Sequence, residues 1–70
     1  MLETKLAWCR RMYGLSQNQL ARKAGVPATV IRAYEQRQRR IDGASAEVVW
    51  RLATALEMPM EALLEHDAEE

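Results

Sequence analysis

The sequence predicts an all-α fold, a compact bundle of five short helices in one domain of 70 residues. Apolar residues recur at helical spacings of three and four, and no segment shows the alternation of a strand. Glycine, proline and capping residues divide the chain into helix-length segments. We expect an ordered core over about residues 2–65, followed by an acidic tail over residues 66–70.

The first helix is expected to begin near the N-terminus and to end at Gly14. Its apolar face contains four residues spaced four, three and four positions apart, which are Leu2, Leu6, Cys9 and Tyr13. Trp8 falls off this face, so we expect it to lie partly exposed over longer side chains. Cys9 is the one cysteine, which excludes an internal disulfide and fits a cytoplasmic protein.

The second helix is expected to start at Gln17 and to end at Gly25. Ser16 and Gln19 have the spacing of a capping box. In this motif the hydroxyl of Ser16 accepts a hydrogen bond from the amide of residue 19, and the side chain of Gln19 reaches back to the amide of Ser16. The helix therefore has a defined first turn.

The third helix is expected over about residues 27–36, because Pro27 fits the first turn of a helix. Ile31 and Tyr34 are spaced to give this helix a buried side. The residues on the opposite side are small or polar: Ala28, Thr29, Arg32, Ala33 and Gln36.

A basic loop follows over residues 37–44 and leads into the fourth helix, which Ser45 caps. The core face of the fourth helix is expected to contain Val49, Leu52, Ala53 and Leu56. Pro59 is expected to open a fifth short helix that runs to about Leu64.

The formal net charge of zero hides two halves of opposite sign. Residues 1–40 carry nine Lys or Arg and two Glu, which gives a net charge of +7. Residues 41–70 carry one Arg and eight Asp or Glu, which gives −7. This asymmetry favours a polyanion-binding face on the first half of the chain. The alternative is that solvated helix faces have segregated by chance.

The second and third helices, with the turn between them, predict a helix-turn-helix. Ala21 is small where two short helices cross at a steep angle, and Gly25 permits the tight turn. Ile31 and Tyr34 hold the third helix on the domain, which leaves its other face outward. A helix exposed in this way fits the major groove of DNA.

The stretch 15–26 (LSQNQLARKAGV) resembles the signature of the Cro- and phage-repressor-type (XRE-like) helix-turn-helix family. Tyr34-Glu35 and the stretch 52–56 (LATAL) resemble two further elements of that family, and the resemblance covers about residues 5–65. It implies a lambda-repressor-like bundle and a bacterial or phage regulator that binds double-stranded DNA, with repression as the expected mode.

The resemblance also implies roles for individual residues. The base-facing positions of the recognition helix are Ala28, Thr29, Arg32 and Ala33. The positions expected to contact phosphate, together with their basic neighbour, are Gln17, Gln36, Arg37, Arg39 and Arg40. Arg10 and Glu35 match a pair that ties the first helix to the third.

Three departures from the family pattern are visible. Arg37 follows the third helix, and Glu57 precedes the fifth, at positions where the family commonly has glycine. Ala28 and Ala33 offer no hydrogen bonds to bases. Direct base reading would then depend on Thr29, Arg32 and methyl contacts to thymine, with room for readout of DNA shape.

A homodimer is expected, because one recognition helix reads only a few base pairs. The candidate interface residues on the fourth and fifth helices are Trp50, Met60 and Leu64. No metal-ligand set or catalytic triad can be built from one cysteine and one histidine, so no cofactor and no enzymatic activity are expected. The alternative function is a protein-interaction module, antitoxin-like or an adapter, whose alanine-bearing third helix docks on a protein partner.

Overall fold

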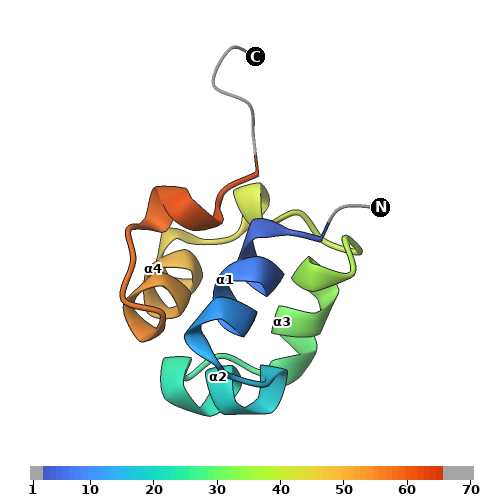
Figure 1. Ribbon diagram of the computed structural model, residues 1–70. Helices are drawn as coiled ribbons and strands as arrows, with labels where there is room; N and C mark the ends of the chain where they lie inside the picture. The colour runs from blue at the N-terminus through green and yellow to red at the C-terminus, as the bar shows by residue number, and fades with distance from the viewer. Residues whose placement is uncertain (1–2, 66–70) are drawn as a thin grey trace.

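The computed structural model describes residues 3–65 and is all-α, as predicted (Figure 1). Leu2 and the predicted tail 66–70 lie outside the described residues. In chain order the elements are α1 (Lys5–Tyr13), α2 (Gln17–Ala24), α3 (Ala28–Glu35), the 3-10 helix η1 (Ile41–Gly43), α4 (Ala46–Ala55) and the 3-10 helix η2 (Met60–Leu63).

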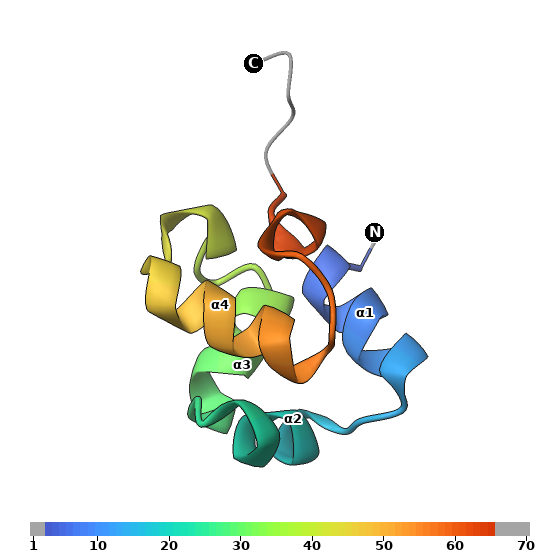
Figure 2. The same cartoon turned by 90° about the vertical axis from the view of Figure 1, so that its left-hand side faces the viewer.

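The helices enclose one hydrophobic core. Helix α2 packs against α3 and α4, whereas α1 contacts α3 and η2, and η2 also contacts α4 (Figure 2). The largest side chains that are fully buried come from every α-helix, the end of α4 and η2, and they are Leu6, Leu20, Ile31, Leu52, Leu56 and Leu63. Burial of such side chains is the main force that holds helices of this length together.

Hydroxyl side chains cap the starts of three helices. The capping box of α2 is confirmed, because the Gln19 amide donates to Ser16 Oγ at 3.0 Å and the Ser16 amide donates to Gln19 Oε1 at 2.8 Å. Ser45 caps α4 as predicted, at 3.2 Å from the amide of Val48. Thr4 caps α1 and is buried, a role that no sequence motif predicted.

Each of the four described α-helices is followed, within two residues of its last residue, by a residue with a left-handed backbone. These residues are Gly14, Gly25, Arg37 (φ 62°) and Glu57 (φ 58°). After each one, the amide of the next residue donates to the carbonyl five positions earlier, as in a Schellman motif. Arg37 and Glu57 are the two positions where the family commonly has glycine, so this chain keeps the turn and accepts a strained backbone there.

One sequence prediction is wrong, and another differs in detail. The expected fifth short helix is present as the 3-10 helix η2, a single tight turn of four residues that buries Leu63 completely. Tyr13 is 37% exposed and does not belong to the core face of α1. Its hydroxyl donates to Glu57 Oε2 and accepts from Lys23 Nζ, each at 2.7 Å, which keeps the phenol at the surface.

None of the described helices is both long and apolar enough to cross a membrane.

Candidate nucleic-acid interface

The turn between α2 and α3 contains Gly25 and Val26 and lies against Arg51 of α4. Gly25 adopts φ 71°, and Val26 beside it is buried. Arg51 of α4 donates from Nη1 to the carbonyl oxygen of Gly25 at 3.4 Å. A Cβ atom added at Gly25 would lie 2.9 Å from that same Nη1 atom, at the end of a side chain that can move, so the positive φ rather than crowding is what favours glycine here. The packing of α2 against α3 and the burial of Val26 between them set the arrangement of the two helices.

The outward side of α3 contains the residues predicted to face bases. Thr29 and Arg32 are exposed, and Ala28 and Ala33 are half-buried. Thr29, Arg32 and Ala33 have the i, i+3, i+4 spacing of one helix face, and Gln36 continues it one turn further. Ile31 and Tyr34, on the other side, are buried at 0% and 4% exposure. The helix therefore presents one small, polar surface to solvent.

Arg10 and Glu35 form a salt bridge that joins α1 to the end of α3. Arg10 Nε lies 2.7 Å from Glu35 Oε2, and Nη2 lies 3.0 Å from Oε1. The two side chains are only 14% and 6% exposed. Arg10 Nη1 also donates to the carbonyl oxygen of Leu15, just before α2, at 2.9 Å. This bidentate pair therefore connects the segments that carry α2 and α3.

Gln17, the first residue of α2, belongs to the same network. Its Nε2 donates to Glu35 Oε1 at 2.8 Å, so the amide is held at the junction of α2 and α3. Backbone N–H groups in the first turn of a helix attract anions. The side chain of Gln17 is thus directed at Glu35, whose carboxylate accepts hydrogen bonds from Arg10 and Gln17.

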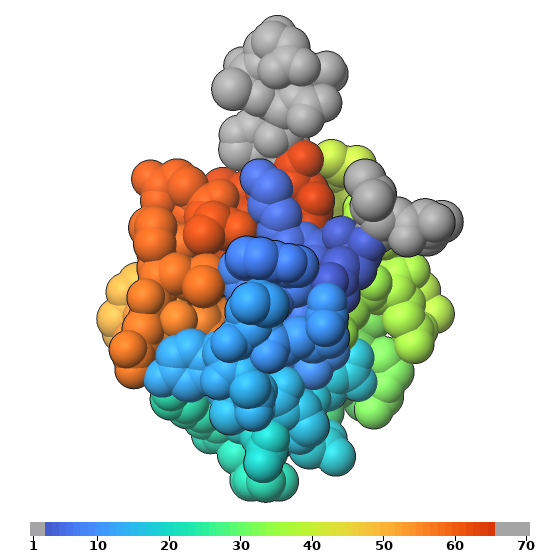
Figure 3. Space-filling model, in the orientation of Figure 1, coloured from blue at the N-terminus to red at the C-terminus, as the bar shows by residue number. Residues whose placement is uncertain are grey.

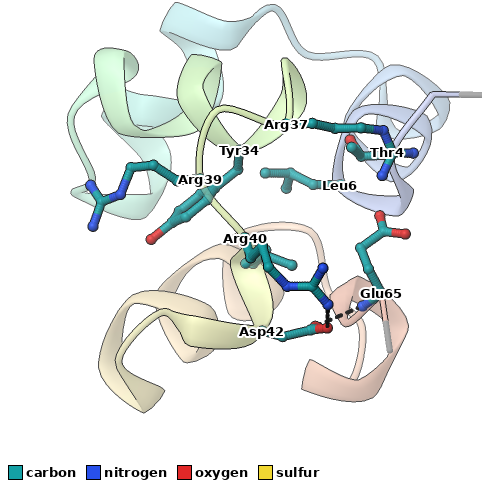
Figure 4. A pocket seen from close by; sticks show the side chains of 9 residues that line it. Thr4, Leu6, Tyr34, Arg37, Arg39, Arg40, Asp42 and Glu65 are labelled. Atoms are coloured by element: carbon teal, nitrogen blue, oxygen red, sulfur yellow. Dashed lines mark hydrogen bonds and ion pairs between the residues drawn. The ribbon is translucent and has the colours of Figure 1, made fainter. Parts of the chain in front are cut away.

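The basic loop, which we define as residues 37–40, leaves the end of α3. Arg37, Arg39 and Arg40 are all exposed. The guanidinium of Arg39 lies over the ring of Tyr34, with its carbon 5.6 Å from the ring centroid. Arg40 Nη2 lies 3.3 Å from Asp42 Oδ2. Gln36, at the end of α3, is also exposed. The loop places three positive charges in the segment that follows the C-terminal end of α3. Arg37 points towards Thr4 at the start of α1, and Arg39 points the opposite way (Figure 4).

The three predicted interface residues differ in exposure. Trp50 on α4 is 57% exposed, whereas Met60 and Leu64 are half-buried and pack against the core. Trp8 and Met12, on the outer side of α1, are 52% and 65% exposed. The space-filling view shows α1 covering the front of the molecule, with α3 and the basic loop to one side and η2 to the other (Figure 3).

No group of three or more His, Cys, Asp or Glu within residues 3–65 is arranged to hold a metal ion. Cys9 is buried in the core, and this burial raises the pKa of its thiol above the usual value. Away from the interface, the hydrogen bonds from Arg11 lower the pKa of Glu3.

The helix-turn-helix family model matches residues 6–63, which is most of the chain. The chain therefore belongs to the helix-turn-helix family, of the XRE-like kind that the sequence motifs indicated, and it is a DNA-binding transcription regulator. A comparison with curated proteins gives no significant sequence match.

The fold is also similar to a solved structure, that of the restriction-modification controller protein C.AhdI from Aeromonas hydrophila. The two chains are 32% identical and superpose with a TM-score of 0.75. The similarity covers 86% of each chain. It extends beyond the helix-turn-helix to nearly the whole domain.

Proposed function

We propose that the protein is a sequence-selective repressor that places α3 in the major groove of double-stranded DNA. The observation that supports this proposal is that the residues suited to bases and those suited to phosphate lie on the packed α2–α3 pair and the segment that follows it. The outward face of α3 carries Thr29 and Arg32, and it ends at Gln36 and the basic loop. Gln17 is fixed to the end of the same helix through Glu35.

Bases and phosphates present different chemical groups, so different residues of this surface suit each of them. Arg32 has the planar donors that suit the O6 and N7 acceptors of guanine, and Thr29 offers a hydroxyl and a methyl group. The methyl groups of Ala28 and Ala33 suit the methyl group of thymine. Gln17, Gln36 and the basic loop are suited to the phosphate strands, whose contacts position the protein without reading sequence.

A two-fold dimer would place two α3 helices in successive major grooves about 34 Å apart on a near-palindromic site. Trp50 is the exposed anchor that we assign to this contact. The similarity to a restriction-modification controller supports a regulator of that kind. The first DNA to examine is therefore the region that flanks the gene of this chain.

Substitutions should separate the two kinds of contact. Gln17→Ala and Arg39→Ala should weaken binding to all sequences alike, because these residues position the protein. Arg32→Ala or Thr29→Ala should instead change which bases are preferred, by about 1–3 kcal/mol at the affected base pair. Selection of binding sites from random duplex DNA with each variant measures this. Unchanged preferences in both groove-facing variants would contradict the assignment of α3.

The two alanines on α3 favour a second function, a protein-interaction module on the same fold. In that case α3 would dock on a protein, and DNA would be bound weakly or not at all. A protein that elutes as a stoichiometric complex with a partner through α3, and shows no DNA affinity at low salt, would establish this alternative.

A further inference from the structure

Tyr34 on α3 is almost completely buried, yet its hydroxyl group reaches solvent. The residue is 4% exposed, and its ring belongs to the hydrophobic core. Within residues 3–65 this hydroxyl makes no hydrogen bond, and no side-chain nitrogen or oxygen there is both buried and unpaired. The small exposed part of Tyr34 therefore includes its phenol oxygen, a hydrogen-bond donor that the described residues leave free.

Arg39 of the basic loop is held beside this hydroxyl at both its backbone and its side chain. Its backbone amide donates to the carbonyl oxygen of Ala33 at 3.2 Å, which ties the loop to the last turn of α3. Its guanidinium lies over the ring of Tyr34, with the carbon 5.6 Å from the ring centroid. The guanidinium and the phenol oxygen both point away from Leu6 and Glu65 (Figure 4). Two donors are therefore directed to the same side of the molecule.

These two donors suit the oxygens of a single phosphate group. DNA phosphates accept hydrogen bonds from arginine and from tyrosine side chains. Arg39 supplies a positive charge, and Tyr34 supplies a neutral donor whose direction is set by the packing of its ring in the core. An arginine that is already stacked on a ring loses less conformational freedom on binding than one that extends into solvent. The pair is thus preorganised for an anion.

We propose that Tyr34, besides its place in the core, is a positioning and phosphate-binding residue. Its ring holds Arg39 in place, and its hydroxyl donates to the phosphate that Arg39 contacts. Because Tyr34 lies in the last turn of α3, this contact fixes the C-terminal end of the helix relative to the DNA backbone. The inference rests on the proposed function, since it needs α3 to lie in the major groove.

Tyr34→Phe tests the hydroxyl, because it keeps the ring. The variant should keep the free energy of unfolding of the unmodified chain, since no described residue bonds to the hydroxyl. Its affinity for a duplex of random sequence should fall about tenfold, as expected for the loss of a hydrogen bond to a charged group. Fluorescence anisotropy and denaturant melts measure the two properties.

Tyr13→Phe is the matched control, because it removes the hydroxyl of a tyrosine outside the proposed DNA-binding face. That hydroxyl bonds to Lys23 and Glu57. The control should bind DNA as the unmodified chain does. An equal loss of affinity in both variants would overturn the inference, because a general effect of removing a phenol would explain it.

The salt response separates the two donors of the pair. Arg39→Ala should make the dependence of affinity on salt shallower, because fewer counterions are released. Tyr34→Phe removes no charge, so its loss should be the same at about 0.05 M and about 0.2 M salt. In an Arg39→Ala background, Tyr34→Phe should cost only about two- to threefold, because the phosphate is no longer held against the hydroxyl. Fully additive losses would show that the two residues do not share a phosphate.

Ring-current shifts in NMR spectra test the stacking without DNA. The side-chain signals of Arg39 should be shifted to the same extent in the unmodified chain and in Tyr34→Phe, and the shift should vanish in Tyr34→Leu. Arginine signals without a ring-current shift in the unmodified chain would overturn the positioning role of Tyr34.

The outcomes separate this inference from the proposed function. If the unmodified chain and Tyr34→Phe bind DNA equally well, the inference is overturned and the proposed function stands. A loss of affinity that accompanies an equal loss of folding stability would also overturn the inference, because packing would explain it. Failure of the unmodified chain to bind DNA at low salt would contradict the proposed function itself, and the phosphate contact with it.

Discussion

Replacing Arg10 by methionine is expected to reduce the free energy of unfolding by about 3–5 kcal/mol, as for other broken buried ion pairs. The change leaves the Glu35 carboxylate, only 6% exposed, without its charged partner. Glu35→Leu should have a similar effect, because it leaves the half-buried Arg10 guanidinium without the carboxylate that pairs with it. Losses of this size are a large part of the stability of a small domain.

The double variant Arg10→Met/Glu35→Leu should recover part of the loss, because no charge is then left buried and unpaired. Denaturant melts of the three variants measure the coupling. The exposed pair Arg11 and Glu3, at 55% and 37% side-chain exposure, provides a matched control. Arg11→Met should change the free energy of unfolding much less, because solvent screens an exposed ion pair. Simple additivity of the Arg10 and Glu35 effects would show that the salt bridge does not couple α1 to α3 energetically.

Trp50→Glu is expected to abolish dimerisation and to weaken operator binding by about 10²- to 10⁴-fold, the range lost when two linked contacts become one. Trp50 is 57% exposed on α4, so the variant should stay folded. A buried aromatic at the centre of an interface is a common anchor, and a carboxylate there would be desolvated beside its copy.

Trp8→Glu is the matched control, because Trp8 is 52% exposed on α1 and lies outside the predicted interface. It should leave the dimer and operator binding nearly unchanged. Sedimentation equilibrium and titration with a palindromic duplex measure both properties. If Trp8→Glu dissociated the dimer while Trp50→Glu did not, the two-fold contact would lie on α1, and the assignment of α4 would be wrong.

Local signals in the sequence predicted much of the fold. The Ser16–Gln19 capping box and the glycine ends of α1 and α2 depend on neighbouring residues, so spacing alone revealed them. The left-handed turns at Arg37 and Glu57 were not predicted from propensity, because tertiary packing and the Schellman hydrogen bonds override it. Their only signal was the departure from glycine in the family pattern.

Contacts between distant segments were the least predictable. The hydrogen bonds that join Glu65 to Asp42 and to Lys5 link residues 23 and 60 positions apart, and no pattern in one sequence pairs them. Tyr13 has helical spacing with the core residues of α1, but its hydroxyl finds partners at the surface. Gln17 was assigned to phosphate from the family resemblance, whereas its bond to Glu35 required the packed helices.

The salt dependence of affinity for duplex DNA tests most directly whether the face formed by α3, Gln17 and the basic loop binds DNA. With about four to six phosphates contacted per dimer, the logarithm of the association constant should fall against the logarithm of salt concentration with a slope of about −4 to −5. Arg39→Ala should make the slope shallower by about one to two, because each dimer loses up to two phosphate contacts. A flat salt response, or no binding even at low salt, would contradict the account.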